Sequence, residues 1–254
     1  MTELKVEGLE MRGGRDAILV TGASFTLASG ELVAVLGPNG AGKTSLLRGA
    51  LGLERASAGQ SLLDGRDTAA LPPRDRARAV AYLPQQRPLA WPSPVRDVVA
   101  LGRFSHGATL GRLGAMDRAA VDRAMKACGL EPLAARACST LSGGELARVH
   151  CARAFAAEAP LLVADEPVAS LDPNHRFRIM DLLRRFVDDG GGALVVIHDI
   201  ELAARYADRL IWMKEGRIVA SGPTAETLSA ERLEEIFSVR ARVDGHRVEL
   251  ERAL

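Results

Sequence analysis

The sequence predicts an α/β fold: a parallel sheet with an antiparallel β segment at its N-terminal end and an inserted, mainly helical segment. Short, continuous apolar runs at 32–36, 161–164 and 193–197 are typical of strands buried on both faces of a parallel sheet. Residues 3–35 read as strands, some with period two. Helical periods without an obvious strand occupy 88–141. Strands and helices alternate after that segment, which favours a parallel α/β core.

Each predicted element has a local signal. Leu4 and Val6, like Leu9 and Met11, are spaced two apart, and Gly30 marks the next turn. The following apolar run enters a glycine-rich loop and then a helical pattern. Further strands are predicted near 62–63 and 80–83. The helical insertion then opens on prolines at 88, 92 and 94.

The C-terminal half predicts two helices, two buried strands and a hairpin. One helix runs from Gly144 through Phe155, and another, at 174–188, lies between the two apolar runs. A hairpin is predicted around Gly216, and the remainder reads as helical with a polar tail. We therefore predict a single domain over 1–254, with a core of 1–87 and 142–254 and a helical subdomain at 88–141.

Composition excludes several functional classes. The chain has 254 residues, 47% of them hydrophobic, and a formal net charge of +1, which argues against a broad basic surface for nucleic acid. Its three cysteines lack metal-ligand spacing, so we expect idle thiols in a reducing compartment. No signal region or apolar run of about 18 residues is present, so a membrane role would require docking on a separate membrane subunit.

A glycine-rich loop follows the strand that ends at Leu36. Its pattern, Gly-x4-Gly-Lys-Thr, is typical of a phosphate loop, because glycines let successive N–H groups turn inward around phosphates. The loop also opens a helix, whose N-terminal dipole favours anions. Lys43 would reach the β- and γ-phosphates of a nucleotide, and the Thr44 hydroxyl would ligate Mg²⁺. The expected ATP-binding residues are Gly37, Pro38, Asn39, Gly40, Ala41, Gly42, Lys43, Thr44 and Ser45.

Two acids end the apolar run at 161–164. A buried strand delivers Asp165 and Glu166 at its carboxyl end, where parallel sheets bind ligands. Asp165 is predicted in the Mg²⁺ shell opposite Thr44, and Glu166 to polarise the attacking water.

A second anion cradle precedes the next helix. Ser142, Gly143 and Gly144 offer a hydroxyl, bare N–H groups and a positive helix end. Because one nucleotide needs only one cradle within a chain, a second predicts a composite site shared between two chains. We call Leu141, Ser142, Gly143, Gly144 and Glu145 the signature segment.

With these motifs in this order, the chain resembles the nucleotide-binding subunits of ABC transporters over essentially its whole length. The resemblance implies a phosphate-loop, RecA-like core, hydrolysis of ATP with Mg²⁺, and a homodimer that closes over two ATP molecules. It implies that the signature segment contacts the partner's ATP. Ser170-Leu171-Asp172 matches the D-loop, so Asp172 is expected beside that same ATP. Gln85 matches the glutamine that contacts Mg²⁺ and senses the γ-phosphate, and His198 the switch histidine on the γ-phosphate.

Three departures from the family pattern stand out. Where an aromatic residue usually stacks on adenine, this chain has Arg12-Gly13-Gly14-Arg15, and either arginine could stack through its guanidinium plane. Ala147 stands where a glutamine is common, and Val168 where threonine is usual. Base selectivity is thus less defined than phosphate binding.

The segment Leu101 to Gly107, with Leu110 to Leu113 and Asp117-Arg118, resembles subunits of iron-siderophore, haem and cobalamin importers. The end of the chain, from Gly222 to Glu226 onwards, shows the same resemblance. That resemblance implies uptake of an iron chelate or haem, with cobalamin or another small solute as the alternative. It implies integral-membrane permease subunits as partners, indirectly a periplasmic substrate-binding protein, no nucleic acid, and a peripheral position on the cytoplasmic face of the inner membrane.

Two classes outside transport compete with this interpretation. A soluble ABC ATPase acting on nucleic acid or ribosomes usually carries paired cassettes or a long coiled coil, and neither pattern is present. A phosphate-loop kinase or GTPase leaves the signature segment, the D-loop and His198 unexplained.

Overall fold

The computed structural model describes residues 2–14, 17–85 and 93–253. It divides into two compact units: unit 1 comprises residues 1–71 and 192–254, and unit 2 comprises 72–191. Unit 2 is wider than the helical subdomain predicted at 88–141, whose limits stay a prediction. The prolines at 88 and 92 lie outside the described residues.

The buried strands of unit 1 form a mainly parallel arrangement in the order β10-β9-β3-β8. Strand β3 (Leu32–Leu36) pairs in parallel with β8 (Gly192–Val196) and β9 (Arg209–Lys214). Every residue of β3 and β8 is buried, as their continuous apolar sequences predict. Strand β10 (Arg217–Pro223) returns antiparallel to β9 and completes the predicted hairpin.

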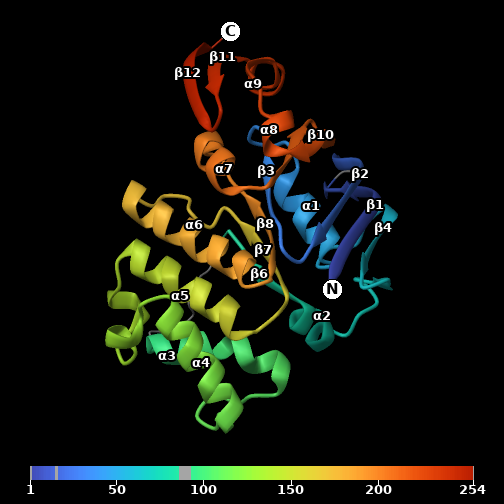
Figure 1. The fold of residues 1–254 in the computed structure, drawn as a ribbon. Coiled ribbons are helices and arrows are strands. Elements are labelled where there is room, and N and C mark those ends of the chain that lie inside the picture. Colours follow the sequence, from blue (N-terminus) through green and yellow to red (C-terminus); the bar gives the residue numbers. More distant parts are fainter. Residues whose placement is uncertain (1, 15–16, 86–92, 254) are drawn as a thin grey trace. The chain divides into compact units, whose positions relative to one another are not determined.

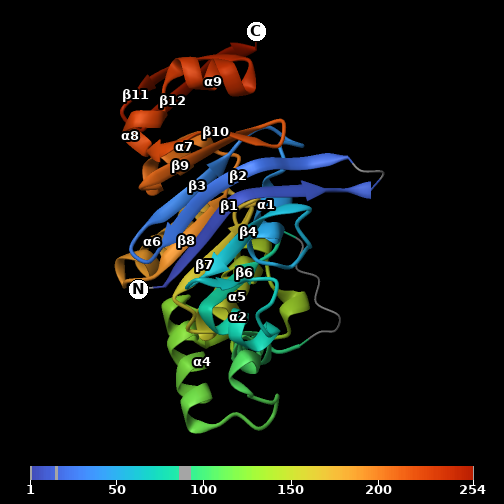
Figure 2. The ribbon, with the colours of Figure 1, turned by 90° about the vertical axis from the view of Figure 1, so that its right-hand side faces the viewer.

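An antiparallel sheet forms the N-terminal part of unit 1. Its order is β2-β1-β4-β5, and β1 lies beside β2 in Figure 2. The apolar residues of β1 that are spaced two apart are all buried, so the period-two pattern predicts the core face. Helix α1 packs against this sheet. The bounds are β1 (Glu3–Arg12), β2 (Ile18–Ala28), β4 (Ala58–Leu63), β5 (Arg66–Asp67) and α1 (Lys43–Ala50).

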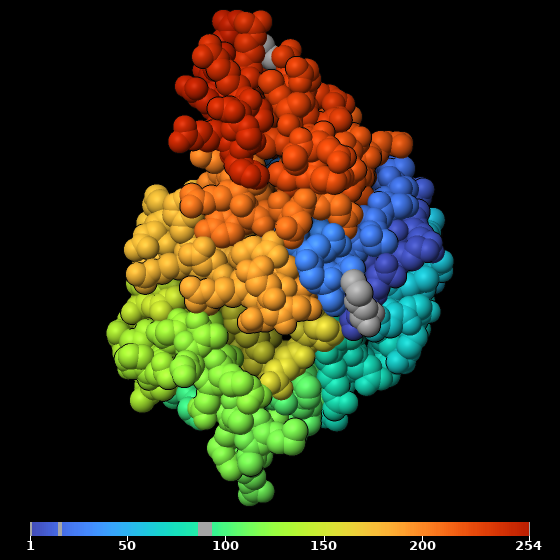
Figure 3. Space-filling model, in the orientation of Figure 1, coloured from blue at the N-terminus to red at the C-terminus, as the bar shows by residue number. Residues whose placement is uncertain are grey.

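The C-terminal segment corrects one prediction. After the helices α7 (Ile200–Tyr206), α8 (Thr224–Thr227) and α9 (Ala230–Phe237), the segment predicted only as a polar tail forms a hairpin. Strands β11 (Val239–Asp244) and β12 (Arg247–Ala253) pair antiparallel, and β11 packs on α9. Figure 3 shows α9 and this hairpin in red on the surface of unit 1. Half-buried residues alternate with exposed ones along β11, which ends at a two-residue turn, Gly245-His246. The charged composition obscured this hairpin signal.

Unit 2 combines a short parallel strand pair with helices (Figure 1). Strand β6 (Val80–Leu83) pairs in parallel with β7 (Leu161–Asp165). Within 93–141 the regular elements are helical, and one isolated bridge joins Pro94 to Ala137. Helix α2 escaped prediction because its sequence is mostly charged and none of its residues is buried. The helices are α2 (Pro73–Ala79), α3 (Val95–Ala100), η2 (Leu101–His106), α4 (Ala115–Ala127), η3 (Glu131–Leu133), η4 (Cys138–Thr140), α5 (Gly143–Ala156) and α6 (Pro173–Asp188).

Among the described residues, no helix combines the length and apolar character needed to cross a bilayer. The three cysteines, Cys128, Cys138 and Cys151, are buried, and none of them forms a disulfide. Burial raises the pKa of the Cys128 and Cys138 thiols. These side chains therefore behave as small apolar groups of unit 2.

Candidate nucleotide site

The phosphate loop joins β3 to α1 in unit 1. Its outer glycines are fixed by close backbone neighbours: a Cβ on Gly37 would overlap the Met213 carbonyl, and one on Gly42 the Leu19 carbonyl. Gly42 also has φ +91°, a conformation that disfavours other residues. The glycine spacing is therefore required by packing against β9 and β2 as well as by the turn.

Lys43 lies over the loop that precedes it. Its Nζ donates to the carbonyl oxygens of Gly37 at 2.8 Å and Pro38 at 2.9 Å, and the residue is only 6% exposed. The N-cap residue of helix α1 is Gly42, a glycine that has no side chain with which to cap the N–H groups of the first turn. An ammonium group and open helix N–H groups together suit an anion such as a phosphate. Thr44 and Ser45, at the start of α1, are half-buried, and Asn39 and Gly40 are exposed.

His198 lies at the same edge of unit 1 as the phosphate loop. Val35 of β3 pairs with Val196 of β8, so the carboxyl ends of these parallel strands are level. His198 is exposed just beyond β8. Asp199 accepts from the Leu202 N–H at 3.0 Å and thereby starts α7. The order of strand, histidine and helix cap directs His198 to the edge where ligands bind in such sheets.

The adenine side of the site is the least defined by side chains. Arg12 is exposed at the end of β1, and Arg15 lies outside the described residues. The N–H of Gly13 donates to the Ala17 carbonyl at 2.8 Å. Ile18, which the sequence did not single out, is 64% exposed at the first residue of β2. Ile18 pairs with Arg12 across β1 and β2, so it offers an apolar surface beside that arginine.

The acidic pair lies in unit 2. Asp165 is the last residue of β7 and fully buried. Glu166 follows with φ +49°, a left-handed backbone that turns its side chain away from the strand direction. Leu83 of β6 pairs with Ala164, so Gln85, exposed two residues beyond β6, leaves the same edge as the two acids. Unit 2 thus brings Gln85, Asp165 and Glu166 to one strand edge.

The D-loop ends in a cap that fixes its backbone. Asp172 accepts from the His175 N–H at 3.0 Å and from the His175 ring at 2.6 Å. The N–H of His175, and then its ring, lower the pKa of the Asp172 carboxyl. Arg176 donates to the Leu171 carbonyl at 2.7 Å. Asp172 is consequently held at the first turn of α6.

The signature segment starts α5 as a capping box. The Ser142 hydroxyl accepts from the Glu145 N–H at 3.3 Å, and the Glu145 carboxylate accepts from the Ser142 N–H at 2.8 Å. That N–H lowers the pKa of the Glu145 carboxyl. The sequence analysis did not predict that Glu145 caps the helix, although Ser-x-x-Glu before a helix is the usual signal of a capping box.

The two departures from the family pattern near the signature segment, Ala147 and Val168, both lie in the core. Ala147 is buried, and Val168 is 6% exposed. Arg148 donates to the carbonyls of Cys128 at 2.9 Å and Gly129 at 3.0 Å, beyond the C-terminal end of α4. The arginine after Ala147 therefore ties α5 to α4. The roles of the site residues toward ATP stay a prediction, now with defined local geometry in each unit.

Comparison with known proteins places these motifs in a family. The ABC transporter family model matches residues 20–169, more than half of the chain. The chain therefore belongs to the ABC transporter family, as the ATP-binding, ATP-hydrolysing cassette. The predicted class and α/β fold are confirmed.

Particular relatives refine this assignment. The chain is 40% identical over 248 residues to the hemin import ATP-binding protein HmuV of Pseudomonas entomophila, covering 96% of this chain and 95% of that protein. It is 40% identical over 241 residues to the cobalamin import ATP-binding protein BtuD of Halobacterium salinarum, covering 94% and 60%. A bacterial ABC transporter cassette solved as a dimer is 26% identical, with a TM-score of 0.75 and coverage of 87% and 98%. The predicted resemblance to haem and cobalamin importers is thus confirmed.

Proposed function

We propose that this chain drives uptake of an iron chelate or haem through a membrane permease by binding and hydrolysing ATP. The single observation that carries the cargo class is the 40% identity, over 96% of the chain, to a hemin import ATP-binding protein. The segment from Leu101 to Gly107, which resembles this importer class, supports it. Its Arg103 is 4% exposed, so this arginine has a structural part and does not present its charge to the cargo.

The phosphate loop supplies the binding energy for ATP. Lys43 exchanges the Gly37 and Pro38 carbonyls for the β- and γ-phosphates, which are better partners because they carry charge. The N–H groups at the start of α1 face the same anion. His198 donates to the γ-phosphate, and Glu166 orients the attacking water. Positioning and charge therefore do most of the chemical work.

Mg²⁺ fits the residues available. A fully buried carboxylate (Asp165), a hydroxyl (Thr44) and an amide (Gln85) are hard oxygen donors of the kind this ion takes. When bound there, Mg²⁺ would supply positive charge that offsets the charge of the phosphates. We assign Asp165, Thr44 and Gln85 to that shell, and they also fix the orientation of the phosphates.

A second copy of the chain completes each site. The signature segment of one copy, with Asp172, caps the ATP on the phosphate loop of the other. The dimeric state of a cassette with a TM-score of 0.75 to this chain supports this arrangement. Closing the dimer excludes water from both ATP molecules, and losing the γ-phosphate lets it reopen.

The proposed partners follow from this cycle. Integral-membrane permease subunits are moved by the closing and reopening of the dimer, and a periplasmic substrate-binding protein delivers cargo to them. The chain itself lies on the cytoplasmic face of the inner membrane. Nucleic acid has no part in the cycle, in line with the formal net charge of +1.

The test is to express the chain with the permease encoded beside its gene and purify the complex. We expect co-purification, Mg²⁺-dependent ATP hydrolysis, and stimulation of that hydrolysis by a haem- or siderophore-loaded binding protein. Recovery of the chain with RNA or DNA, and without a polytopic membrane protein, would instead support a soluble ABC ATPase.

A cobalamin importer is the second candidate, because the Halobacterium salinarum relative is equally identical at 40%. The same complex distinguishes the two: stimulation by a cobalamin-loaded binding protein, and not by a haem- or siderophore-loaded one, favours cobalamin.

A further inference from the structure

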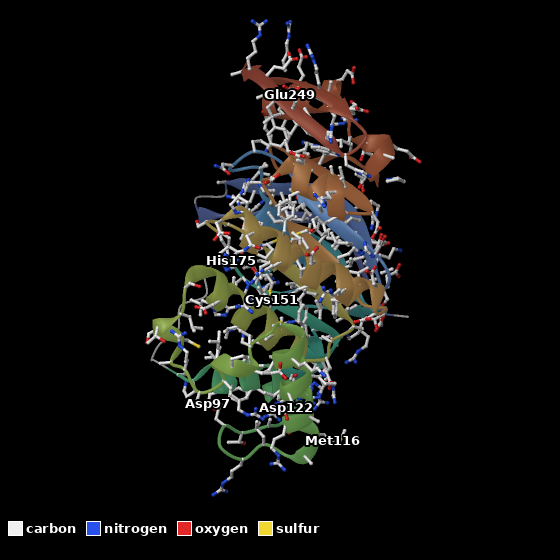
Figure 4. The ribbon with its side chains drawn as sticks, turned by 60° about the vertical axis from the view of Figure 1, so that its left-hand side comes forward. Asp97, Met116, Asp122, Cys151, His175 and Glu249 are labelled. Atoms are coloured by element: carbon white, nitrogen blue, oxygen red, sulfur yellow. The ribbon has the colours of Figure 1, made fainter. Side chains whose placement is uncertain are left out.

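The side chain of His175, which no catalytic assignment uses, lies between the D-loop and the signature segment. Figure 4 labels it near the N-terminal end of α6. Its Nδ1 lies 2.6 Å from Asp172 Oδ2, and its backbone N–H lies 3.0 Å from Asp172 Oδ1. An ionised carboxylate only accepts, so Nδ1 carries the hydrogen. Two bonds to one carboxylate fix the direction of the ring.

The ring fills the space beside Gly144 of the signature segment. A Cβ on Gly144 would overlap Cγ, Cδ2 and Nε2 of His175. Gly144 does not have a positive φ, so its backbone conformation does not require glycine. Glycine also costs a helix about 1 kcal/mol relative to alanine. Close packing of the His175 ring is therefore the local reason for this glycine.

A second contact joins the same two segments. A Cβ on Gly143 would lie 4.0 Å from Leu171 Cδ2, ordinary van der Waals distance. The Leu171 carbonyl is in turn held by Arg176 at 2.7 Å. Both glycines of the signature segment thus face residues at the junction of the D-loop and α6.

We propose that His175 is a positioning residue that locks the D-loop and the signature segment of one chain together, so that both reach the partner's ATP as one rigid piece. This inference rests on the proposed composite site and names a part of its machinery. It explains why two segments about 30 residues apart in the chain need a shared anchor, since misplacement of a catalytic group by about 1 Å can cost about 100-fold in rate.

The test compares Gly144→Ala, His175→Ala and the double variant in ATP hydrolysis by the permease complex. We expect His175→Ala to lower kcat about 10-fold and Gly144→Ala about 100-fold, with KM for ATP unchanged, because single-site binding does not use these residues. Removing the ring makes room for the added methyl group, so the double variant should recover to the level of His175→Ala.

Two further variants separate positioning from general damage. His175→Asn retains an N–H donor toward Asp172 and should remain within about 3-fold of the parent. His246→Ala, at an exposed histidine in the β11–β12 turn, should leave hydrolysis unchanged. Parent-like hydrolysis by His175→Ala, or a double variant no more active than Gly144→Ala, overturns the proposal.

Thermal unfolding of the same four proteins tests the contact without ATP. We expect the loss of melting temperature in the double variant to be smaller than the sum of the losses in the two single variants. The reason is that the methyl group added at position 144 no longer meets the His175 ring. If the parent complex does not hydrolyse ATP, the proposed function fails, and with it the role of His175 in catalysis. If the losses of melting temperature in the two single variants simply add in the double variant, the His175–Gly144 contact is overturned, whatever the outcome for ATP hydrolysis.

Discussion

At two positions, local backbone strain coincides with residues of the proposed site. Glu166 and Ser170 both have left-handed backbones, with φ +49° and +60°, and both lie between β7 and α6. Each such residue costs about 1–3 kcal/mol, which neighbouring structure must offset. The fully buried β7 and the Asp172 cap of α6 are the fixed ends on either side. These two fixed ends hold the turn between β7 and α6, and the turn sets the direction of the Glu166 side chain.

Glu166→Gln tests that carboxylate without changing the backbone requirement. We expect ATP binding to persist and hydrolysis to fall about 100-fold or more, because glutamine cannot accept the proton of the attacking water. Size-exclusion chromatography with ATP should then show a trapped dimer. Glu201→Gln, in the first turn of α7, is the matched control and should turn over normally. Undiminished turnover of Glu166→Gln would remove Glu166 as the base.

The Glu145 carboxylate should stabilise α5 in a pH-dependent way. Its pKa is lowered by the Ser142 N–H, so its contribution is present above the unfolded pKa of about 4.3 and is lost as pH falls through the lower folded value. Glu145→Gln keeps the capping geometry and removes the charge. The melting temperatures of parent and variant, measured from pH 7 downward, should converge as the carboxylate protonates. A gap that stays constant to pH 3 would contradict this account.

At the scale of elements, a buried arginine holds the helices of unit 2 together. Arg103 of η2 is 4% exposed. Its Nε lies 3.0 Å from Asp117 of α4, and one terminal nitrogen lies 2.9 Å from both the Ala156 carbonyl and Glu158 beyond α5. Although burial of Glu158 opposes ionisation, Arg123 and Arg103 lower its pKa. The network joins three elements through one guanidinium group.

Arg103→Met should destabilise the protein by about 1–3 kcal/mol, because it leaves the Ala156 carbonyl and the half-buried Asp117 carboxylate without this donor, whereas Glu158 keeps Arg123. Arg123→Met is a matched control: it removes a charge from the same Glu158, but Arg123 is 64% exposed and its loss should cost less than about 1 kcal/mol. Urea unfolding midpoints measure both. Equal effects of the two variants would show that the Arg103 network adds nothing beyond a surface ion pair.

At the scale of the whole molecule, the proposed site residues are divided between the two units. The phosphate loop and His198 belong to unit 1, whereas Asp165, Glu166, the D-loop and the signature segment belong to unit 2.

Ser142→Arg should separate nucleotide binding from dimer closure. A large cation at the start of α5 obstructs the partner's ATP, so hydrolysis should fall about 100-fold, whereas affinity for ATP in the isolated chain should stay within about 2-fold. Ser221→Arg, at an exposed serine of β10, adds the same side chain to unit 1 and should not affect turnover. Normal hydrolysis by a dimeric Ser142→Arg variant would refute the composite site.

Periodicity and turn chemistry predict most of this fold, because each acts over a few residues. The buried runs became β3, β7 and β8, and Gly30 and Gly216 mark real turns. The β11–β12 hairpin was missed because its alternating residues are only half-buried and its charge resembles that of a disordered tail. Helix α2 was missed for a similar reason: it buries no residue.

The sequence by itself determined the family, the order of the motifs and the candidate residues, since spacing along the chain encodes loops that bind phosphate. Tertiary structure alone decided what each glycine and charge is for. Gly144 makes room for His175, and Arg103 serves packing rather than cargo. Those roles depend on contacts between segments distant in the chain, and no local pattern records which side chain will occupy the neighbouring space.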